Sequence, residues 1–247
     1  MERWKGRVAI VTGASRGIGL SITEALARNG MIVIACARNI EDIQELQRSL
    51  PPGANDIRAR VCDASKEEDI LCLFRDIEAS PGYVDVLVNN VGVAPNQPPL
   101  ADSSTFAWRD MLNLNVLAGS VFTRGALRLM EHDGRNAGNI ININSTYGSY
   151  IRPGSGMSFY AGTKHMLTAL SKALNAELRQ KKSKVRVTNL SPSVTRTSAT
   201  EKSLHLFGFP PLEPQDVSQA VLFVLSAPPH VNIRQLSIAS TESPIIF

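Results

Sequence analysis

Short, continuous apolar runs alternate along this chain with longer helical patterns, and this alternation restricts the fold more than any other feature. Runs of this kind are strands buried on both faces, as in a parallel sheet. Helices that connect such strands by right-handed crossovers cover both faces of the sheet. The sequence therefore predicts an α/β fold with an open, doubly wound parallel sheet. The runs lie at residues 8–11, 31–35, 57–61, 84–88, 139–143, 185–190 and 233–238, and the helical patterns at 18–29, 41–50, 66–79, 104–132 and 158–181.

Length and composition indicate a single domain with a large core. The chain has 247 residues, of which 43% are hydrophobic and 19% charged, and no linker or repeat divides residues 1–247. The net charge of +4 is small, so we expect no nucleic-acid partner. No segment approaches the ~18 consecutive apolar residues of a membrane helix, no signal-peptide pattern opens the chain, and the 3 cysteines lack metal-ligand spacing. We therefore expect a cytoplasmic protein with no membrane span and no metal ion.

A glycine-rich segment, residues 12–19, joins the first apolar run to the first helical pattern. Glycines at this place permit a tight turn and a close backbone approach to a pyrophosphate, while the helix N-terminus adds partial positive charge. A lone glycine triplet is more often a simple turn, but its position between a strand and a helix favours a nucleotide site. The residues that we expect to contact the cofactor here are Gly13, Ser15, Arg16, Gly17, Ile18 and Gly19.

The residue after the second apolar run indicates which dinucleotide is bound. Proteins that use NAD place Asp or Glu there to bind the ribose 2′-hydroxyl. This chain has Arg38 instead, and a guanidinium suits a 2′-phosphate. Arg16 in the glycine turn can approach the same phosphate. The alternative interpretation makes both arginines ordinary surface charges, but together they favour NADP(H).

Tyr160 and Lys164 lie four residues apart, on one face of a predicted helix, and Ser145 follows the run 139–143. Ser145 therefore stands at the sheet edge where open α/β folds bind ligands. A Tyr-x-x-x-Lys pair is a weak signal alone, but beside a dinucleotide site the chemistry is coherent. We expect the Lys164 ammonium to lower the pKa of the Tyr160 phenol, and the serine hydroxyl to hold a substrate oxygen. His165 points about 100° away around the helix, so we interpret it as structural.

Taken together, these motifs resemble the short-chain dehydrogenase/reductase family, in its single-domain branch, over nearly the whole chain. The resemblance implies a Rossmann-type fold, a nicotinamide cofactor and association into a homodimer or homotetramer through the helices at 104–132 and 158–181. The segments 12–19, 89–92 and 192–197 match the family's TGxxxGxG, NNAG and PG motifs. The roles implied are adenine contact for Asp63, cofactor contact for Asn90, Thr195 and Thr197, a proton-relay water held by Asn115, substrate binding by Ser145, general acid/base chemistry by Tyr160, and nicotinamide ribose binding by Lys164.

Shorter pieces, at 1–4, 141–145 and 241–242, resemble a narrower group of this family. That group includes insect NADP-dependent farnesol dehydrogenases and a vertebrate relative that acts on ketosteroids. Two residues depart from the family pattern, because Val91 replaces the alanine of NNAG and Ser193 replaces the glycine of PG. We expect the Cβ of Ser193 to strain the turn toward the nicotinamide.

Residues 195–212 interrupt the alternation of strands and helices and contain Leu204, Leu206, Phe207 and Phe209. The segment is either a surface loop that packs these side chains into the core or a lid over an apolar substrate. Its position after the strand that meets the nicotinamide favours the lid. The sequence therefore predicts an NADP(H)-dependent oxidoreductase that interconverts an apolar alcohol (isoprenoid, steroid or other lipid-like) and its carbonyl. The alternatives are a catalytically quiet NADP(H)-binding sensor or scaffold, and a sugar-nucleotide epimerase or lyase.

Overall fold

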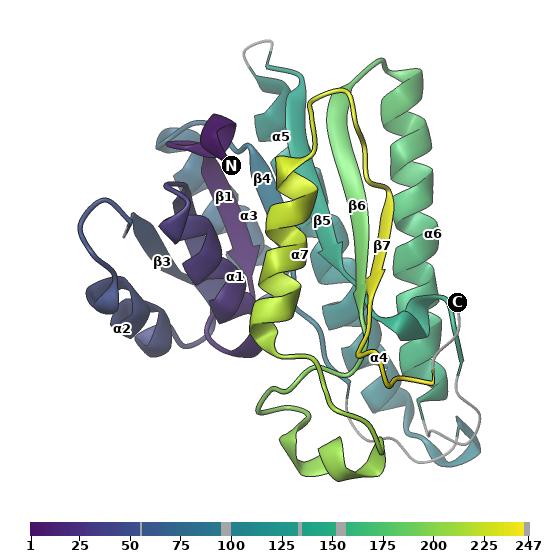
Figure 1. Cartoon of the computed structure of the whole chain (residues 1–247). Helices are drawn as coiled ribbons and strands as arrows, with labels where there is room; N and C mark the ends of the chain where they lie inside the picture. The colour runs from purple at the N-terminus through teal and green to yellow at the C-terminus, as the bar shows by residue number, and fades with distance from the viewer. Residues whose placement is uncertain (55, 95–99, 133–134, 152–156, 245–247) are drawn as a thin grey trace.

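Seven parallel strands form one central sheet in the computed structural model, which describes residues 1–54, 56–94, 100–132, 135–151 and 157–244. The strand order is β3-β2-β1-β4-β5-β6-β7, so the chain reverses its direction of winding between β1 and β4. The predicted Rossmann-type, doubly wound α/β fold in a single domain is therefore confirmed (Figure 1). The strands are β1 (Val8–Thr12), β2 (Ile32–Ala37), β3 (Ile57–Val61), β4 (Val86–Asn89), β5 (Ala137–Ile143), β6 (Lys184–Pro192) and β7 (Gln235–Ile238).

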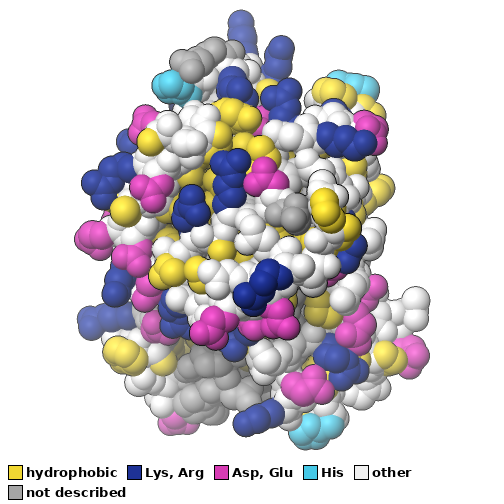
Figure 2. All heavy atoms as spheres, turned by 90° about the vertical axis from the view of Figure 1, so that its left-hand side faces the viewer, with side chains coloured by type: hydrophobic (Ala, Val, Ile, Leu, Met, Phe, Trp, Pro, Cys, Tyr) yellow, Lys and Arg dark blue, Asp and Glu magenta, His cyan; other side chains and the backbone are white. Residues whose placement is uncertain are grey.

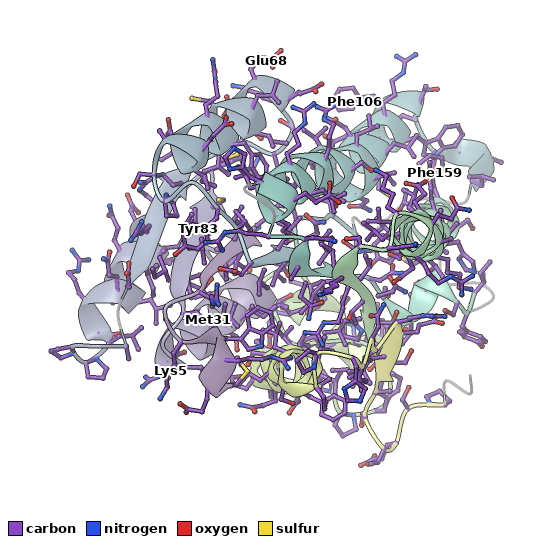
Figure 3. All side chains as sticks on the ribbon, turned by 90° about the horizontal axis from the view of Figure 1, so that it is seen from above. Lys5, Met31, Glu68, Tyr83, Phe106 and Phe159 are labelled. Carbon is purple, nitrogen blue, oxygen red and sulfur yellow. The ribbon has the colours of Figure 1, made fainter. Side chains whose placement is uncertain are left out.

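Helices cover both faces of this sheet, as right-handed crossovers require. Seen from above, the sheet lies between one layer with α1 and α7 and another with α3, α5 and α6 (Figure 3). None of the helices within the described residues is long and apolar enough to span a membrane. The helices are α1 (Gly17–Arg28), α2 (Glu41–Ser49), α3 (Glu67–Ala79), α4 (Thr105–Leu112), α5 (Ala118–Glu131), α6 (Ser158–Gln180) and α7 (Pro214–Ser226).

Each face of the sheet has its own hydrophobic core, because successive strand side chains point in opposite directions. In β1, Ala9 and Val11 pack in the core under α1 and α7, whereas Val8 and Ile10 pack in the core under α3 and α5. All four side chains are fully buried. The continuous apolar run that predicts a two-sided strand is explained by this arrangement.

The helical pattern predicted at 104–132 is confirmed as helical from Thr105 to Glu131, but it is not a single regular α-helix. A π-helical turn, Asn113–Leu117, separates α4 from α5. Such a turn accommodates an extra residue without ending the helix, and it is common at functional sites. The spacing of hydrophobic residues does not reveal this turn, because an apolar helix face continues in α4 before it and in α5 after it.

Helix α7 is not among the helical patterns taken from the sequence, although its N-terminus carries a recognisable signal. Pro214 occupies the first turn, and Glu213 and Asp216 form a capping box. Proline is favoured at the first helical position, and a capping box satisfies two unpaired N–H groups. The helix packs against α1 and belongs to the core that lies under both.

The surface at the β3 edge carries charges of both signs. In Figure 2, Lys and Arg side chains lie scattered among Asp and Glu side chains over this face. The basic residues of this face are thus not gathered into one continuous patch.

Gly125 of α5 allows α3 and α5 to pack closely, and we predict that alanine there destabilises the fold. A Cβ at Gly125 would lie 2.4 Å from Cδ2 and 2.7 Å from Cγ of Phe74, so the ring would have to move. Overpacking of this kind costs about 1–3 kcal/mol, more than the ~1 kcal/mol that alanine adds to helix propensity. We expect Gly125→Ala to lower the free energy of unfolding by about 1 kcal/mol, measured in urea.

Gly162 of α6 provides the matched control, because a Cβ there would meet nothing within 4 Å. Gly162→Ala should raise the free energy of unfolding by up to ~1 kcal/mol. Equal stability of the two variants would contradict the packing argument.

Candidate active site

The carboxyl ends of the strands meet at one edge of the sheet, and the predicted site residues follow these ends. The turn that contains Gly13 follows β1, Arg38 follows β2, Asn90 follows β4 and Ser145 closely follows β5. Residues 193–213 leave β6 at the same edge and extend beyond it (bottom of Figure 1). Parallel pairing thus brings together residues that are far apart in the sequence.

The glycine turn after β1 has a backbone that only glycine adopts without strain. Gly13 and Gly17 have φ angles of 64° and 53°. A Cβ at Gly19 would lie 2.2 Å from the carbonyl oxygen of Gly13, so no side chain fits between the turn and α1. Arg16 stands at the N-cap without a side-chain cap, which leaves donors at the start of α1 for an anion. This cradle fits the pyrophosphate of a dinucleotide.

Thr12 connects the glycine turn to the end of β4. Its Oγ1 accepts hydrogen bonds from the backbone N–H groups of Asn90 and Val91, at 2.9 and 3.1 Å. The Asn90 side chain donates back to the carbonyl oxygens of Thr12 and Gly13, at 2.9 and 3.1 Å. Asn90 therefore holds the glycine turn against the end of β4. Thr12 is missing from the residues selected by sequence, although it opens the glycine motif.

The end of β2 places Arg38 near Asp63, on the β3 side of the glycine turn. The Asp63 carboxylate accepts hydrogen bonds from the backbone N–H and the hydroxyl of Ser65, at 3.0 and 2.8 Å. These bonds, and to a smaller extent the positive charge of Arg38, hold the pKa of Asp63 below its usual value. Arg38 and Arg16 are both exposed. Both can therefore reach a ligand from solvent.

Ser145, Tyr160 and Lys164 come together where β5 ends and α6 begins. Lys164 is buried and its Nζ donates to the carbonyl oxygen of Ile143, at 3.2 Å. The same Nζ lies 5.6 Å from the centre of the Tyr160 ring, and Ser145 forms a side-chain hydrogen bond with Tyr160. The predicted grouping of these three side chains is present in the structure.

Aromatic contacts fix the first turn of α6. Phe159, which precedes Tyr160, stacks on Trp108 of α4 with ring centres 5.1 Å apart and planes at 12°. On the other side, the rings of Tyr147 and Tyr160 meet edge to face, with centres 6.0 Å apart. The Phe159 stack thus joins the first turn of α6 to α4, and Tyr147 packs on the ring of Tyr160.

Burial controls the protonation of this site, and it corrects the expected pKa of the tyrosine. Desolvation raises the pKa of Tyr160 to about 12, although the hydrogen bond from Ser145 lowers it. Desolvation also lowers the pKa of Lys164 to about 8. We expected Lys164 to lower the tyrosine pKa, but the loss of water around the phenol outweighs any such effect. Each shift favours the neutral form of its side chain.

Asn115 lies in the π-helical turn and faces the same group of residues. Its Oδ1 accepts from the backbone N–H of Val93 at 2.7 Å, and its Nδ2 donates to the Val93 carbonyl and to Thr163 Oγ1, at 3.0 and 3.1 Å. A Cβ at Gly92 would lie 3.2 Å from Asn115 Oδ1 and 3.7 Å from Lys164 Nζ. Asn115 thus ties the loop after β4 to the helix that carries Tyr160.

Residues 195–212 form a loop closed at its base. Thr195 and Leu212 pair as a parallel bridge, and Arg196 binds the carboxylates of Glu201 and Glu213, at 3.3 and 3.0 Å. Thr195 is buried, whereas Thr197 lies against the glycine turn, where a Cβ at Gly17 would be 3.0 Å from its Cγ2.

The four apolar side chains of this loop do not enter the core. Phe207 and Phe209 meet edge to face, with ring centres 6.1 Å apart, and Leu206 is 64% exposed. Leu204 is only half-buried and joins neither hydrophobic core. The interpretation of a loop that packs its apolar residues into the core is therefore wrong.

Two further expectations concern Ser193 and His165. Among the described residues, the only non-glycine residues with positive φ are Asn136 and Lys182. Ser193 thus has an ordinary backbone, and the expected strain from its Cβ is absent. His165 Nδ1 lies 2.9 Å from the carbonyl oxygen of Ala161 in its own helix.

Comparison with known proteins agrees with this geometry. The family described as short chain dehydrogenase matches residues 7–205. Dehydrogenase/reductase SDR family member 11 of Gallus gallus is 40% identical over 260 residues, with 98% of this chain and 99% of that protein covered. Farnesol dehydrogenase of Aedes aegypti is 39% identical over 239 residues, with 96% and 97% covered.

Solved structures give the same result. A metagenomic short-chain oxidoreductase in complex with NADP is 28% identical with a TM-score of 0.81, covering 96% of this chain and 98% of that one. The alcohol dehydrogenase of the archaeon Thermococcus sibiricus, complexed with 5-hydroxy-NADP, is 25% identical with a TM-score of 0.85, covering 98% and 100%. The resemblance predicted from the motifs is confirmed, and the chain belongs to the short-chain dehydrogenase/reductase family of oxidoreductases.

Proposed function

We propose that this protein uses NADP(H) to interconvert an apolar alcohol (isoprenoid, steroid or otherwise lipid-like) and its carbonyl compound. The observation that carries the proposal is the grouping of Ser145, Tyr160 and Lys164 at the sheet edge that also carries the glycine cradle. A phenol, a hydroxyl and a buried amine at such a place suit proton transfer to an oxygen atom.

The mechanism assigns one task to each side chain. A nicotinamide dinucleotide, when bound, supplies or accepts the hydride. In reduction, the carbonyl carbon gains the hydride and the oxygen takes the proton of the Tyr160 hydroxyl, so an alcohol forms. Ser145 donates a hydrogen bond to the same oxygen, where negative charge develops. Lys164, next to Tyr160, returns a proton to the phenolate.

Asn115 supports the return of that proton to the site. Both N–H groups of its amide and one lone pair of its oxygen are engaged by Val93 and Thr163. A relay water at this residue would therefore be held mainly by the backbone of the π-helical turn. The side chain keeps that turn in contact with α6.

The choice of NADP(H) rests on Arg38 and Arg16. Both side chains are exposed, and Arg38 occupies the position after β2 where NAD-binding proteins have an acidic residue. The two guanidinium groups would bind the 2′-phosphate through charge-assisted hydrogen bonds, which are about twice as strong as neutral ones. Gly13, Ser15, Gly17, Ile18 and Gly19 would contact the pyrophosphate, Asp63 and Asn90 the adenosine side, and Thr195 and Thr197 the nicotinamide side.

The apolar substrate class rests on the loop at 195–212, which we propose is a lid. Its leucine and phenylalanine side chains lie outside both cores, at the edge where the substrate must meet Tyr160. Apolar side chains that gather outside the core mark binding surfaces, whereas single ones do not. One relative is a farnesol dehydrogenase, which agrees with this class of substrate.

We also propose that the protein associates through α5 and α6. Leu117, Met166 and Leu170 expose between 40% and 57% of their surface on or beside these helices. Exposed apolar residues at a helix pair are typical of an interface between subunits.

Replacement of Tyr160 tests the reaction. We expect Tyr160→Phe to reduce turnover about a hundredfold or more, because the general acid is lost, and to leave NADPH affinity within about twofold. The assay follows NADPH oxidation with isoprenoid aldehydes, ketosteroids and a sugar aldehyde, and NADPH binding is followed by its fluorescence. Tyr83→Phe, remote from the site, is the control. Full activity in Tyr160→Phe would refute the proposal, and tight NADPH binding without wild-type turnover on any substrate would favour a sensor or scaffold.

Replacement of Arg38 tests the cofactor separately. Arg38→Asp should lower the ratio of kcat/KM for NADPH over NADH by about tenfold or more, since hydrogen bonds to a charged group contribute ~1.5–3 kcal/mol. Arg75→Asp on α3 makes the same change in charge away from the site and should leave the ratio unaltered. An unchanged ratio in Arg38→Asp would mean that Arg38 does not bind the phosphate.

Burial of Lys164 makes stability depend on pH in a defined direction. Its pKa falls from 10.5 to about 8 on folding, so between those values the unfolded chain binds more protons and wild-type stability rises with pH. Below about pH 8 the folded chain carries the full cost of a buried ammonium. We expect Lys164→Met to be more stable than wild type at pH 7, by up to about 3 kcal/mol, with the difference shrinking toward pH 10.

Denaturant titrations at several pH values measure this difference. The raised pKa of Tyr160 makes the free energy of unfolding fall as pH rises, but only above the ordinary tyrosine pKa of 10.0. The useful range is therefore pH 7–10. Lys172→Met replaces an exposed lysine of the same helix and should show no such trend. A constant difference between Lys164→Met and wild type across this range would contradict the burial argument.

A further inference from the structure

Asn144 is a buried asparagine, 4% exposed, that contacts both α6 and β6. Its Nδ2 lies 3.1 Å from the carbonyl oxygen of Lys164, 2.9 Å from Thr168 Oγ1 and 2.9 Å from Asn189 Oδ1. Two N–H groups therefore serve three acceptors. The contact to Lys164 is to the backbone of a residue whose side chain belongs to the proposed active site.

The surrounding residues pack closely on that carbonyl group. Thr168 Oγ1 donates to the carbonyl oxygens of Gly148 and Lys164, at 2.9 and 3.2 Å. A Cβ at Gly148 would lie 2.5 Å from Asn144 Nδ2 and 2.9 Å from the Lys164 carbonyl oxygen. We refer to Asn144, Gly148 and Thr168 as the Lys164 carbonyl junction.

Three consecutive residues at the end of β5 each contact a different group of the Tyr160–Lys164 turn. The carbonyl of Ile143 accepts from Lys164 Nζ, the amide of Asn144 donates to the Lys164 carbonyl, and the hydroxyl of Ser145 bonds to Tyr160. The strand end thus determines the position of this helical turn at three points. Asn144 is the only one of the three whose side chain holds the helix backbone.

The amide of Asn144 both stabilises and destabilises the fold. Its Oδ1 is buried and finds no hydrogen-bond partner within the described part of the chain, and an unpaired buried acceptor destabilises a fold. An apolar residue would remove that acceptor, but it would also take away the donor to Asn189 Oδ1. The benefit of Asn144 therefore comes from its N–H groups, which hold α6 and β6.

We propose that Asn144 is a positioning residue that holds the Lys164 backbone, and with it Tyr160, in register with Ser145. This inference rests on the proposed function, because it assigns a role in the same reaction. The side-chain contacts of Asn144 are with groups of α6 and β6. It acts through the helix, and a shift of 1 Å in catalytic groups reduces turnover by about a hundredfold.

Asn142 offers a matched comparison on the same strand. It is 8% exposed, and its Nδ2 also bonds to α6, at Ser171 Oγ, 2.9 Å away and two turns beyond Lys164. Asn142→Leu removes this bond and the one that Asn142 Oδ1 accepts from Asn89 Nδ2, whereas Asn144→Leu removes the bonds to Lys164, Thr168 and Asn189. A purely structural role predicts that the loss of activity follows the loss of stability in both variants.

We expect the two variants to differ in turnover. Both should lower the melting temperature, but Asn144→Leu should reduce kcat by about tenfold to a hundredfold, with the Kd for NADPH within twofold of wild type. Asn142→Leu should keep kcat within threefold. Equal kcat in the two folded variants would overturn the proposal, as would an equal loss of NADPH affinity and turnover in Asn144→Leu.

Thr168→Val tests the junction with a smaller change and serves where Asn144→Leu does not fold. It removes the hydroxyl of Thr168, the second side-chain donor to the Lys164 carbonyl, and should also lower kcat at unchanged NADPH affinity. The double variant should lose no more than the stronger single variant, because both act on one carbonyl group. Additive losses would show that the two side chains act separately.

Amide hydrogen exchange keeps this inference distinct from the proposed function. Peptides from the first turns of α6 should exchange faster in Asn144→Leu than in wild type, and Asn142→Leu should leave them protected. This exchange result is expected whether or not the wild-type protein turns over a carbonyl substrate. A wild-type protein without turnover would refute the proposed function but not the positioning role of Asn144. Unchanged exchange in Asn144→Leu would refute the positioning role.

Discussion

The hydrogen bonds between Thr12 and the end of β4 are the interaction on which the rest of the site depends. They join β1 to β4 at the point where the winding of the sheet reverses, and ligands of open α/β sheets bind at such a point. Thr12 Oγ1 satisfies two N–H groups beyond the last strand pairing, so the ends of these strands cannot separate. Next to this contact, Asn90 bonds to the glycine turn at Gly13, and Val93, two residues beyond Val91, bonds to Asn115.

Much of this architecture is predictable from local patterns. Apolar runs identify the seven strands, since a strand buried on both faces leaves a continuous hydrophobic segment. Ser145, Tyr160 and Lys164 are found because their residue types and spacing match one reaction, and the structure places them together. Parallel pairing then brings the carboxyl ends of these strands to the same edge of the sheet.

Other features depend on contacts between distant residues. The π-helical turn at 113–117 keeps the apolar face of its neighbours, so the sequence pattern does not mark it. The pKa of Tyr160 depends on how much water the fold removes, which residue spacing cannot give. The proposed role of Asn144 rests on its contacts with three acceptors on α6 and β6. None of these acceptors is adjacent to Asn144 in the chain, so the sequence alone does not reveal the role.

The closed base of the loop at 195–212 has a consequence for how members of this family diverge. The chain leaves the sheet at Thr195 and returns beside it at Leu212, and Arg196 joins the two sides by ion pairs. Each doubling in the length of such an excursion costs only about 0.6 kcal/mol in closure entropy. The tip can therefore accept insertions or exchanges of sequence without disturbing the cofactor cradle or α6. Under the proposed function, substrate range and cofactor use would therefore change independently, one in this loop and the other at Arg38.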